Sequence, residues 1–499
     1  MRPDITVAMR SINRRALLAS AAGAGLAAAL PGVAGAQGSR TGVDAATWTP
    51  DYINSIAGTQ DFDTAAECAR VVPLNYTGRL TYWYWGPNQA SSEIEKTMDV
   101  EFWKAFAKTY PNIKVTAQNL DYNQMLDKLR TAALGKSAPM VARLPILWGP
   151  EFAAKGQLME FGPKDVGFGV DEFWPGAMKS VAWKGKTYGV PTNNETMALI
   201  WNADLFRQAG LDPENPPATW DDLVVYSKQI KDKTGKNGYG LVARVNAGNT
   251  PFRAMPQIWA YGGGALDEAD AVPTYQKIDI NNAGTKAALQ AFANMYVRDK
   301  SVPVSALTNT NTENEDPFIA GQLAMMIAHP SEYAIMLDRA AKATGEDRKI
   351  ADKVVANMRY GLIPKGPARR AVVFGGSNAH VFKPELVEGG TDMQAVKAFV
   401  AFMTGPEWSI KMAWNSSNPG NVRAFRSKWM RERLDTIKFL NVTTSMLPNG
   451  IPFPVLPQSA EIMNIIVPNL LQNVLTQKMT VDAAADTAAK QIKELLSDL

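Results

Sequence analysis

Apolar positions along the first third of the chain repeat with two alternating periods. The aromatic run Leu80–Trp85 ends at a Gly-Pro pair and predicts a strand. Between Ser92 and Tyr110 the apolar side chains recur every four residues, which predicts a helix. The pattern continues with a strand at Ile113–Gln118, a helix at Met125–Leu134 and a strand at Met140–Leu147. This alternation predicts an α/β fold with a parallel sheet and helices on its faces.

The middle and the end of the chain continue the same rhythm. We expect helices at Thr219–Ile230, Asn282–Asp299, Asp316–Gly321 and Met393–Met403, and strands at Gly240–Val245 and Leu323–Ala328. From Val481 to Leu499 one face is apolar, which predicts an amphipathic closing helix. No internal repeat or low-complexity linker divides the chain. If it forms two lobes, it therefore crosses between them more than once.

The N-terminus has the three regions of a secretory signal. The pair Arg14-Arg15 precedes an almost pure Ala, Leu and Gly run, and Ala34-Gly35-Ala36 offers a cleavage site. The apolar run is shorter than the ~20 residues of a membrane span. We therefore expect residues 1–36 to be a cleavable signal, of the twin-arginine or the general type, and the mature protein to be periplasmic. Residues 37–78 show no period and are expected to form a leader on the outside of the fold.

Composition narrows the function. The 499 residues include only two histidines and one cysteine, Cys68, which excludes an intramolecular disulfide and disfavours a His- or Cys-rich metal site. The signal contains four arginines and one aspartate, so the formal charge of +4 falls to +1 in the mature chain. We therefore expect no nucleic-acid or membrane partner, and neither a metal nor a cofactor.

Motifs for nucleotide chemistry are weak. Ser180–Thr187 lacks the first glycine of a phosphate loop, and the glycines at Gly262–Gly264 lack the spacing of a dinucleotide fingerprint. The carboxylates Glu195, Glu313 and Glu332 leave a glycosidase pair open, because sequence gives no distance between them.

Tryptophan is the informative residue type, with 13 in the chain. Trp85, Trp148, Trp259 and Trp414 fall at strand ends or in loops, near planar polar residues such as Asn88, Arg143, Asn193, Asn194 and Glu195. Flat rings against the apolar face of a sugar, with amides and charged groups on its hydroxyls, are what carbohydrate recognition needs. For each tryptophan taken alone, core packing is the alternative.

The segment Trp183–Asp222 resembles the central signature of the family 1 extracellular solute-binding proteins, the sugar receptors of bacterial ABC importers. It contains G-K-T-Y-G-V-P, then Trp201-Asn202, A-G-L and P-P-A-T-W. Further similar stretches are Phe318–Ile327, Gly361–Pro367, Phe402–Glu407 and Pro452–Ile492. The resemblance covers about residues 78–499 in order.

The resemblance implies a two-lobed periplasmic-binding-protein fold with three interlobe crossings and a ligand in the cleft, closed by hinge motion. By matching segments we place the crossings near Asn193–Thr196, Ala328–Ser331 and Gly375–Ala379. The N-terminal lobe would then comprise residues 79–193 plus 330–376, and the C-terminal lobe 194–329 plus 377–499.

The resemblance also suggests ligand-binding residues. Glu195 matches a glutamate that contacts maltose in the maltose-binding members, and Tyr333 matches an aromatic near the second crossing. Ser331 and Ile462 stand where those members have stacking tryptophans, which argues against a maltodextrin in the same pose. The whole expected set is Trp85, Asn88, Tyr122, Arg143, Trp148, Asn193, Asn194, Glu195, Trp259, Tyr261, Glu332, Tyr333, Gly376, Ser377, Trp414 and Arg423.

These observations together predict a monomeric periplasmic receptor without catalytic activity. It would deliver a sugar or oligosaccharide to an inner-membrane ABC permease with its cytoplasmic ATPase. Another polar solute, such as a polyol or a glycerophosphodiester, is the alternative within the fold, and a secreted carbohydrate-active enzyme is the alternative outside it.

Overall fold

The structure is a computed structural model that describes residues 48–87, 91, 93–246, 248–267, 277–413, 417–437 and 439–497. All of these belong to one compact unit, Ser39–Leu499. The expected signal at 1–36 and the first part of the leader lie outside the described residues. In the described part of the chain, no helix combines the length and the apolar character needed to cross a bilayer.

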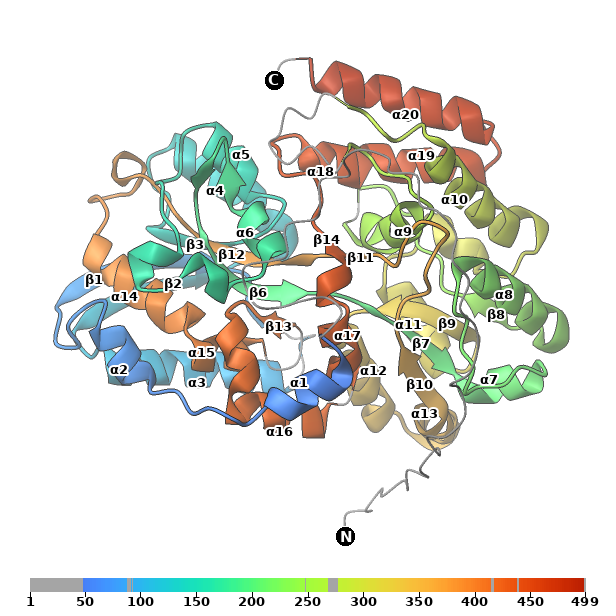
Figure 1. Ribbon diagram of the computed structural model, residues 1–499, viewed down its shortest axis with the longest axis horizontal. Helices are drawn as coiled ribbons and strands as arrows, with labels where there is room; N and C mark the ends of the chain where they lie inside the picture. The colour runs from blue at the N-terminus through green and yellow to red at the C-terminus, as the bar shows by residue number, and fades with distance from the viewer. Residues whose placement is uncertain are drawn as a thin grey trace, which may run out of the picture. The chain divides into compact units, whose positions relative to one another are not determined.

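The first lobe is built on a six-stranded sheet in the order β13-β6-β12-β3-β1-β2. The strands are β1 (Gly78–Tyr84), β2 (Ile113–Asn119), β3 (Val141–Pro145), β6 (Val190–Glu195), β12 (Gly375–Val381) and β13 (Asn418–Pro419). β1 runs parallel to β2 and β3, and β12 runs antiparallel to both β3 and β6. The carboxyl ends of β1, β2, β3 and β6 therefore meet at one edge (Figure 1).

The second lobe is built on a four-stranded sheet in the order β10-β7-β9-β8. Its strands are β7 (Ala198–Asn202), β8 (Asn237–Tyr239), β9 (Leu323–Ala328) and β10 (Met358–Gly361). Two small sheets pair β4 (Ala182–Trp183) with β5 (Lys186–Thr187), and β11 (Val372–Val373) with β14 (Gly450–Ile451).

Helices cover the sheets. Up to the first crossing they are α1 (Pro50–Ile56), α2 (Thr64–Ala69), α3 (Glu93–Thr109), α4 (Tyr122–Leu134), α5 (Gly149–Ala154), η1 (Pro163–Val166), η2 (Val170–Glu172) and α6 (Pro175–Ser180). Those of the second lobe are α7 (Ala203–Gln208), α8 (Trp220–Thr234), α9 (Asn249–Ala260), α10 (Ala283–Ala293), η3 (Asn294–Arg298), η4 (Val304–Leu307), α11 (Thr312–Ile319), α12 (Pro330–Lys342) and α13 (Gly345–Asn357). The remainder are η5 (Pro384–Leu386), α14 (Met393–Thr404), α15 (Pro406–Met412), η6 (Val422–Arg426), α16 (Lys428–Thr436), α17 (Phe439–Ser445), η7 (Leu447–Asn449), α18 (Ser459–Glu461), η8 (Ile462–Ile466), α19 (Val467–Leu475) and α20 (Val481–Leu495).

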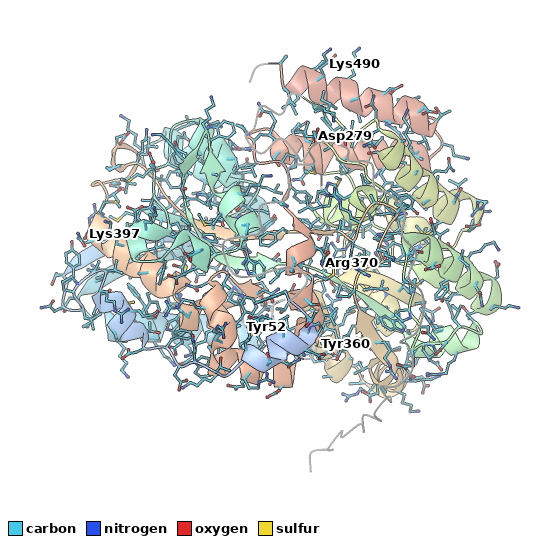
Figure 2. The ribbon with its side chains drawn as sticks, viewed as in Figure 1. Tyr52, Asp279, Tyr360, Arg370, Lys397 and Lys490 are labelled. Carbon is cyan, nitrogen blue, oxygen red and sulfur yellow. The ribbon has the colours of Figure 1, made fainter. Side chains whose placement is uncertain are left out.

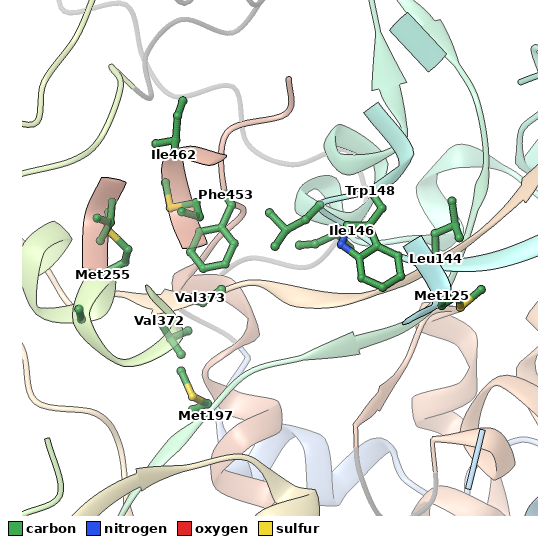
Figure 3. Packing of buried hydrophobic residues seen from close by; sticks show 14 of the residues in the cluster. Met125, Leu144, Ile146, Trp148, Met197, Met255, Val372, Val373, Phe453 and Ile462 are labelled. Atoms are coloured by element: carbon green, nitrogen blue, oxygen red, sulfur yellow. The ribbon is translucent and has the colours of Figure 1, made fainter. Parts of the chain in front are cut away.

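A large apolar cluster joins the two lobes. Figure 3 shows Leu144 and Trp148 from the first lobe and Met255 and Phe453 from the second within this one cluster. Lysines such as Lys397 on α14 and Lys490 on α20 extend outward (Figure 2). The apolar faces of the helices and strands of both lobes therefore pack into one shared core.

The predicted strand at Gly240–Val245 is wrong. The strand of this region is β8, which ends at Tyr239, and Leu241–Ala243 is a buried segment without regular structure. Its apolar side chains fill the core while the Ala243 amide donates to the Ala306 carbonyl at 2.9 Å. An apolar run alone does not distinguish a strand from an irregular core segment.

The lobe boundaries differ from the expected ones. β10 pairs with β7, so residues 330–361 stay with the second sheet, and β12 lies wholly in the first sheet. The chain therefore crosses between β6 and β7, between β10 and β12, and between α17 and α18. β6 ends at Glu195 and β7 begins at Ala198, and Ala328–Ser331 is a turn from β9 into α12 within the second lobe.

The described part of the leader, from Trp48, contains two helices that were not expected from the sequence. Thr49 caps α1 and Asp63 caps α2 through their side-chain oxygens. The Trp48 ring packs edge-on against Trp174 and Phe425, at 5.1 and 5.2 Å between centroids. Cys68 is buried at the end of α2, where its carbonyl accepts a hydrogen bond from the Tyr110 hydroxyl at 3.1 Å.

Candidate functional site

A cavity of about 250 Å³ opens at the carboxyl edge of the first sheet, and we call it the polar cavity. Trp85 follows directly after β1, Glu195 is the last residue of β6, and Arg143 lies on β3 between them. Its charged and polar lining also includes Glu95 and Asp99 of α3, Ser331 of α12 and Lys411 of α15. In α/β folds, ligands bind outside the carboxyl ends of the strands.

Three aromatic rings form one wall beside the polar cavity. The Trp85 ring lies 5.8 Å from Tyr122 and 6.5 Å from Trp148, and these two are 5.1 Å apart. Tyr122 is 43% exposed, whereas Trp148 is 6% exposed and so acts as a support for the others. The Arg143 guanidinium lies 4.8 Å from the centre of the Trp85 ring, a cation–π distance. This contact fixes the orientation of the Trp85 indole.

A hydrogen-bond chain runs from Arg143 to Glu195. The Arg143 Nη2 donates to Asn193 Oδ1 at 3.0 Å, and Asn193 Nδ2 donates to Glu195 Oε1 at 3.3 Å and to Ser417 Oγ at 3.1 Å. Arg143 Nε is buried and makes no hydrogen bond. Asn193 therefore links the Arg143 guanidinium to the Glu195 carboxyl group and positions it.

Burial governs the charge of the carboxyl groups. It raises the pKa of Glu195 to about 7, against the opposing effects of Arg143 and of the Asn193 hydrogen bond. It also raises the pKa of Asp99, whose Oδ2 accepts a hydrogen bond from the Tyr84 hydroxyl at 3.3 Å. Glu195 can consequently both donate and accept near neutral pH, which suits a hydroxyl-bearing ligand.

The second cation of the cavity is held by rings and a carboxylate. Lys411 Nζ lies 2.6 Å from Glu407 Oε1 and 4.6 and 4.0 Å from the centres of Trp408 and Trp429. Its charge is therefore largely satisfied within the protein.

Several predicted residues stabilise the fold near the cavity. Asn194 donates from Nδ2 to the Pro419 carbonyl at 3.1 Å, on the β13 side of β6. Ser377 is fully buried in β12. At Gly376, φ is +129° and an added Cβ would lie 2.1 Å from the Asn193 carbonyl oxygen. Only glycine fits there, because the backbone carrying Asn193 approaches so closely.

Other predicted residues lie in the second lobe or on the leader side of the first. Tyr333 stacks on Phe439 at 4.7 Å, Trp259 is 2% exposed within α9, and the Tyr261 hydroxyl bonds Asp221. Glu332 and Arg253 form a buried ion pair. Arg423 pairs with Glu67 of the leader at 2.6 Å and with Glu172 at 3.3 Å. Asn88 and Trp414 lie outside the described residues.

The three carboxylates considered for a glycosidase pair, Glu195, Glu313 and Glu332, each interact with a different partner. Glu332 is bound to Arg253, and Glu313 accepts hydrogen bonds from the Thr310 amide and hydroxyl. In the described chain, no group of three His, Cys, Asp or Glu side chains could hold a metal ion. The arrangement at Glu195 suits reversible binding through hydrogen bonds and ring contacts.

Sequence reasoning missed Asp99 and Lys411. Asp99 follows Met98 on the predicted helix α3, and an acid next to an apolar stripe was the available signal. Lys411 comes from α15, more than 200 residues after Glu195, and only the fold brings the two together.

The sequence model of the family described as "Bacterial extracellular solute-binding protein" matches residues 90–410. The chain belongs to this family. It is 26% identical over 408 residues to a putative binding protein of Brucella abortus, covering 79% of this chain and 88% of that one. It is also 26% identical over 324 residues to the sn-glycerol-3-phosphate-binding periplasmic protein of Shigella dysenteriae, covering 62% and 68% of the two chains.

The fold is shared with solved receptors. The GacH receptor of Streptomyces glaucescens aligns with a TM-score of 0.68 at 23% identity, over 85% of this chain and 100% of that one. The predicted two-lobed α/β fold is thereby confirmed. Members of the family bind solutes outside the cytoplasm and work with ABC permeases, so the chain has the role of a substrate-binding protein.

Proposed function

We propose that the chain is the periplasmic substrate-binding component of an ABC importer and that it binds a sugar or oligosaccharide in the polar cavity. The observation that carries the proposal is the Trp85 ring, held by Arg143 at 4.8 Å, beside the paired Asn193 and Glu195. The Trp85 ring can stack on the apolar face of a pyranose, and the Asn193 and Glu195 side chains can hydrogen-bond to its hydroxyls. Delivery to an inner-membrane permease with its ATPase follows from this role.

Charge favours an uncharged ligand. Glu95, Asp99 and Glu195 line the same cavity, and Lys411 is already paired with Glu407. A phosphate would be repelled by these carboxylates when they are ionised. A neutral polyhydroxyl solute meets no such repulsion.

A titration of intrinsic fluorescence with a panel of mono- and disaccharides tests the proposal. We expect saturable binding of one sugar, which is recovered unchanged after long incubation; turnover of the sugar would refute the receptor function. Trp85→Ala should weaken binding at least tenfold. Trp183→Phe, in the β4–β5 hairpin, is the matched control and should bind as the parent does.

A glycerol phosphate or glycerophosphodiester is the second candidate. The similarity to an sn-glycerol-3-phosphate-binding protein and the Arg143 guanidinium in the lining of the polar cavity favour it. Titration with sn-glycerol-3-phosphate separates the two, since binding of this anion should tighten at low salt whereas binding of a neutral sugar should not.

Export is tested on the full precursor. We propose cleavage near Ala36, which N-terminal sequencing of the periplasmic protein would detect as a start at Gln37. Replacing Arg14-Arg15 by two lysines should block export if the twin-arginine route is used and leave it intact if the general route is used.

A further inference from the structure

The leader helix α2 contacts the partner of a cation that lines the polar cavity. The Thr64 hydroxyl, on the first residue of α2, donates a hydrogen bond to Glu407 Oε2 of α15. The other oxygen of the same carboxylate, Glu407 Oε1, lies 2.6 Å from Lys411 Nζ. Lys411 is in the lining of the polar cavity. One carboxylate therefore bridges a residue of the leader and a residue of the cavity.

The groups in this chain of contacts are held in place. Thr64 directly follows Asp63, whose side chain accepts a hydrogen bond from the Ala66 amide at 3.0 Å and so caps α2. The side chains of Glu407 and Lys411 are only 23% and 14% exposed. Their pairing is therefore screened less than a pair on the surface, and the position of the carboxylate affects the charge that a ligand meets.

Two tryptophan rings also hold the Lys411 ammonium. Its Nζ lies 4.6 Å from the centre of the Trp408 ring and 4.0 Å from that of Trp429, both of which are cation–π distances. Trp408 is 5% exposed and stacks on Phe402 at 5.3 Å between ring centres, so this ring belongs to the core. With Glu407 in place, the ammonium is neutralised within the protein and attracts an anion in the cavity only weakly.

We propose that Thr64 and Glu407 determine specificity: they keep Lys411 neutralised, so that the polar cavity prefers an uncharged sugar to the corresponding sugar acid. This inference rests on the proposed function and specifies the selectivity of the same site. It also assigns a role to the leader. Thr64 precedes residues 90–410, so its contribution comes from outside the part of the chain that the family model matches.

Calorimetric titration of the mature protein with paired hexoses and hexuronates tests the proposal. The pairs are glucose with glucuronate, galactose with galacturonate, and mannose with mannuronate, in which a carboxylate replaces the terminal hydroxymethyl group. We expect the parent to bind one hexose more tightly than its uronate. Glu407→Gln should lower this preference by about 10-fold or more, because the charge of Lys411 is then left for the uronate. The uronate affinity that this variant gains should fall as salt is added.

Variants of Thr64 test the contribution of the leader. Thr64→Val keeps the size of the side chain but removes the hydroxyl, so the preference for the hexose should fall about 2- to 10-fold. Thr64→Ser retains a hydroxyl and should keep the preference of the parent. Glu67→Gln, on the same helix, removes a carboxylate that pairs with Arg423 instead, and it should also keep that preference.

The outcomes distinguish this inference from the proposed function. A preference that is unchanged in both Glu407→Gln and Thr64→Val, or a parent that binds a uronate at least as tightly as its hexose, would overturn the inference while leaving the sugar receptor intact. Absence of binding by every member of the pairs would count against both proposals. If Glu407→Gln is too unstable for titration, the comparison of Thr64→Val with Thr64→Ser decides.

Discussion

Glu195 illustrates how one side chain links stability to ligand recognition. Its folded-state pKa is about 7, compared with 4.5 for an exposed glutamate, because burial penalises the charged form. The folded state therefore holds the proton more tightly than the unfolded state. This contribution to stability is fully present below about pH 4.5 and is lost as the pH rises to about 7.

Glu195→Gln should therefore flatten the pH dependence of the free energy of unfolding. Between pH 4.5 and 7.5, we expect the variant to lose about 1–3 kcal/mol less of its free energy of unfolding than the parent does, as measured in urea titrations. Glu93→Gln is the control, since Glu93 is exposed and paired with Lys96, which lowers its pKa. Glu315, whose pKa is also raised to about 7 by burial, contributes equally to all three proteins. An unchanged slope in Glu195→Gln would contradict the prediction.

At the level of elements, the close approach of β12 to β6 positions the cavity. Gly376→Ala should destabilise the protein by about 2–4 kcal/mol, because the new methyl group overlaps the Asn193 carbonyl at an unfavourable φ. Gly185→Ala is the matched variant: its φ is +77°, but no atom lies within 4 Å of the added Cβ. It should cost about 1 kcal/mol. Equal midpoints of thermal unfolding for the two variants would refute the steric argument.

Trp48 of the leader, just before α1, also contributes to stability. Trp48 is 3% exposed and its Nε1 donates to the Thr444 carbonyl at 3.1 Å. Trp48→Ala should lower the free energy of unfolding by about 3–5 kcal/mol through the lost ring contacts. Trp48→Phe keeps a ring and should lose less than half of that in the same denaturant titration. A neutral Trp48→Ala would show that the leader is dispensable for folding.

Sequence predicted elements better than it predicted the site. The strands before Trp85 and around Arg143 follow from local periodicity, whereas the strand that ends at Glu195 was not predicted. Trp259 and Tyr333 could not be separated from Trp85 in the same way, because burial depends on which helix packs over them. The leader escaped prediction because α1 and α2 are too short to show a period.

At the scale of the whole molecule, α17 contacts the leader, the first crossing and the second lobe. The Thr196 hydroxyl at the first crossing bonds the Thr443 carbonyl, Phe439 stacks on Tyr333 of the second lobe, and Trp48 of the leader bonds Thr444. The leader is in turn fixed to the first lobe by the Gln60 amide, which donates to the Arg426 carbonyl at 2.9 Å. The segment 48–60 therefore restrains α17, which lies against the first crossing between the lobes.

Removing residues 37–58 should broaden the distribution of distances between the lobes. Leu134 on the first lobe and Val225 on the second are 80% and 59% exposed. Spin labels attached at Leu134→Cys and Val225→Cys would give the distribution of interlobe distances by double electron–electron resonance. Glu67→Gln is the control, because it breaks the ion pair to Arg423 while leaving α1 on α17. An unchanged distribution in the shortened chain would contradict the restraint.

The three crossings show the limit of pattern reasoning at this scale. The crossing near Asn193–Thr196 was placed by matching segments to the family, and not by periodicity. β10 pairs with β7, so residues 358–361 belong to the second sheet. The local sequence of a strand does not determine which other strand it pairs with.

Cys68 has a practical consequence for this chain. Its thiol is 2% exposed, and burial raises its pKa to about 12, so it is almost entirely protonated at neutral pH. A protonated, enclosed thiol reacts slowly with maleimides and disulfides. A single cysteine introduced near the polar cavity would therefore be the one position to take up a dye, and the native protein could serve directly as the scaffold of a reagentless optical sensor for its own solute.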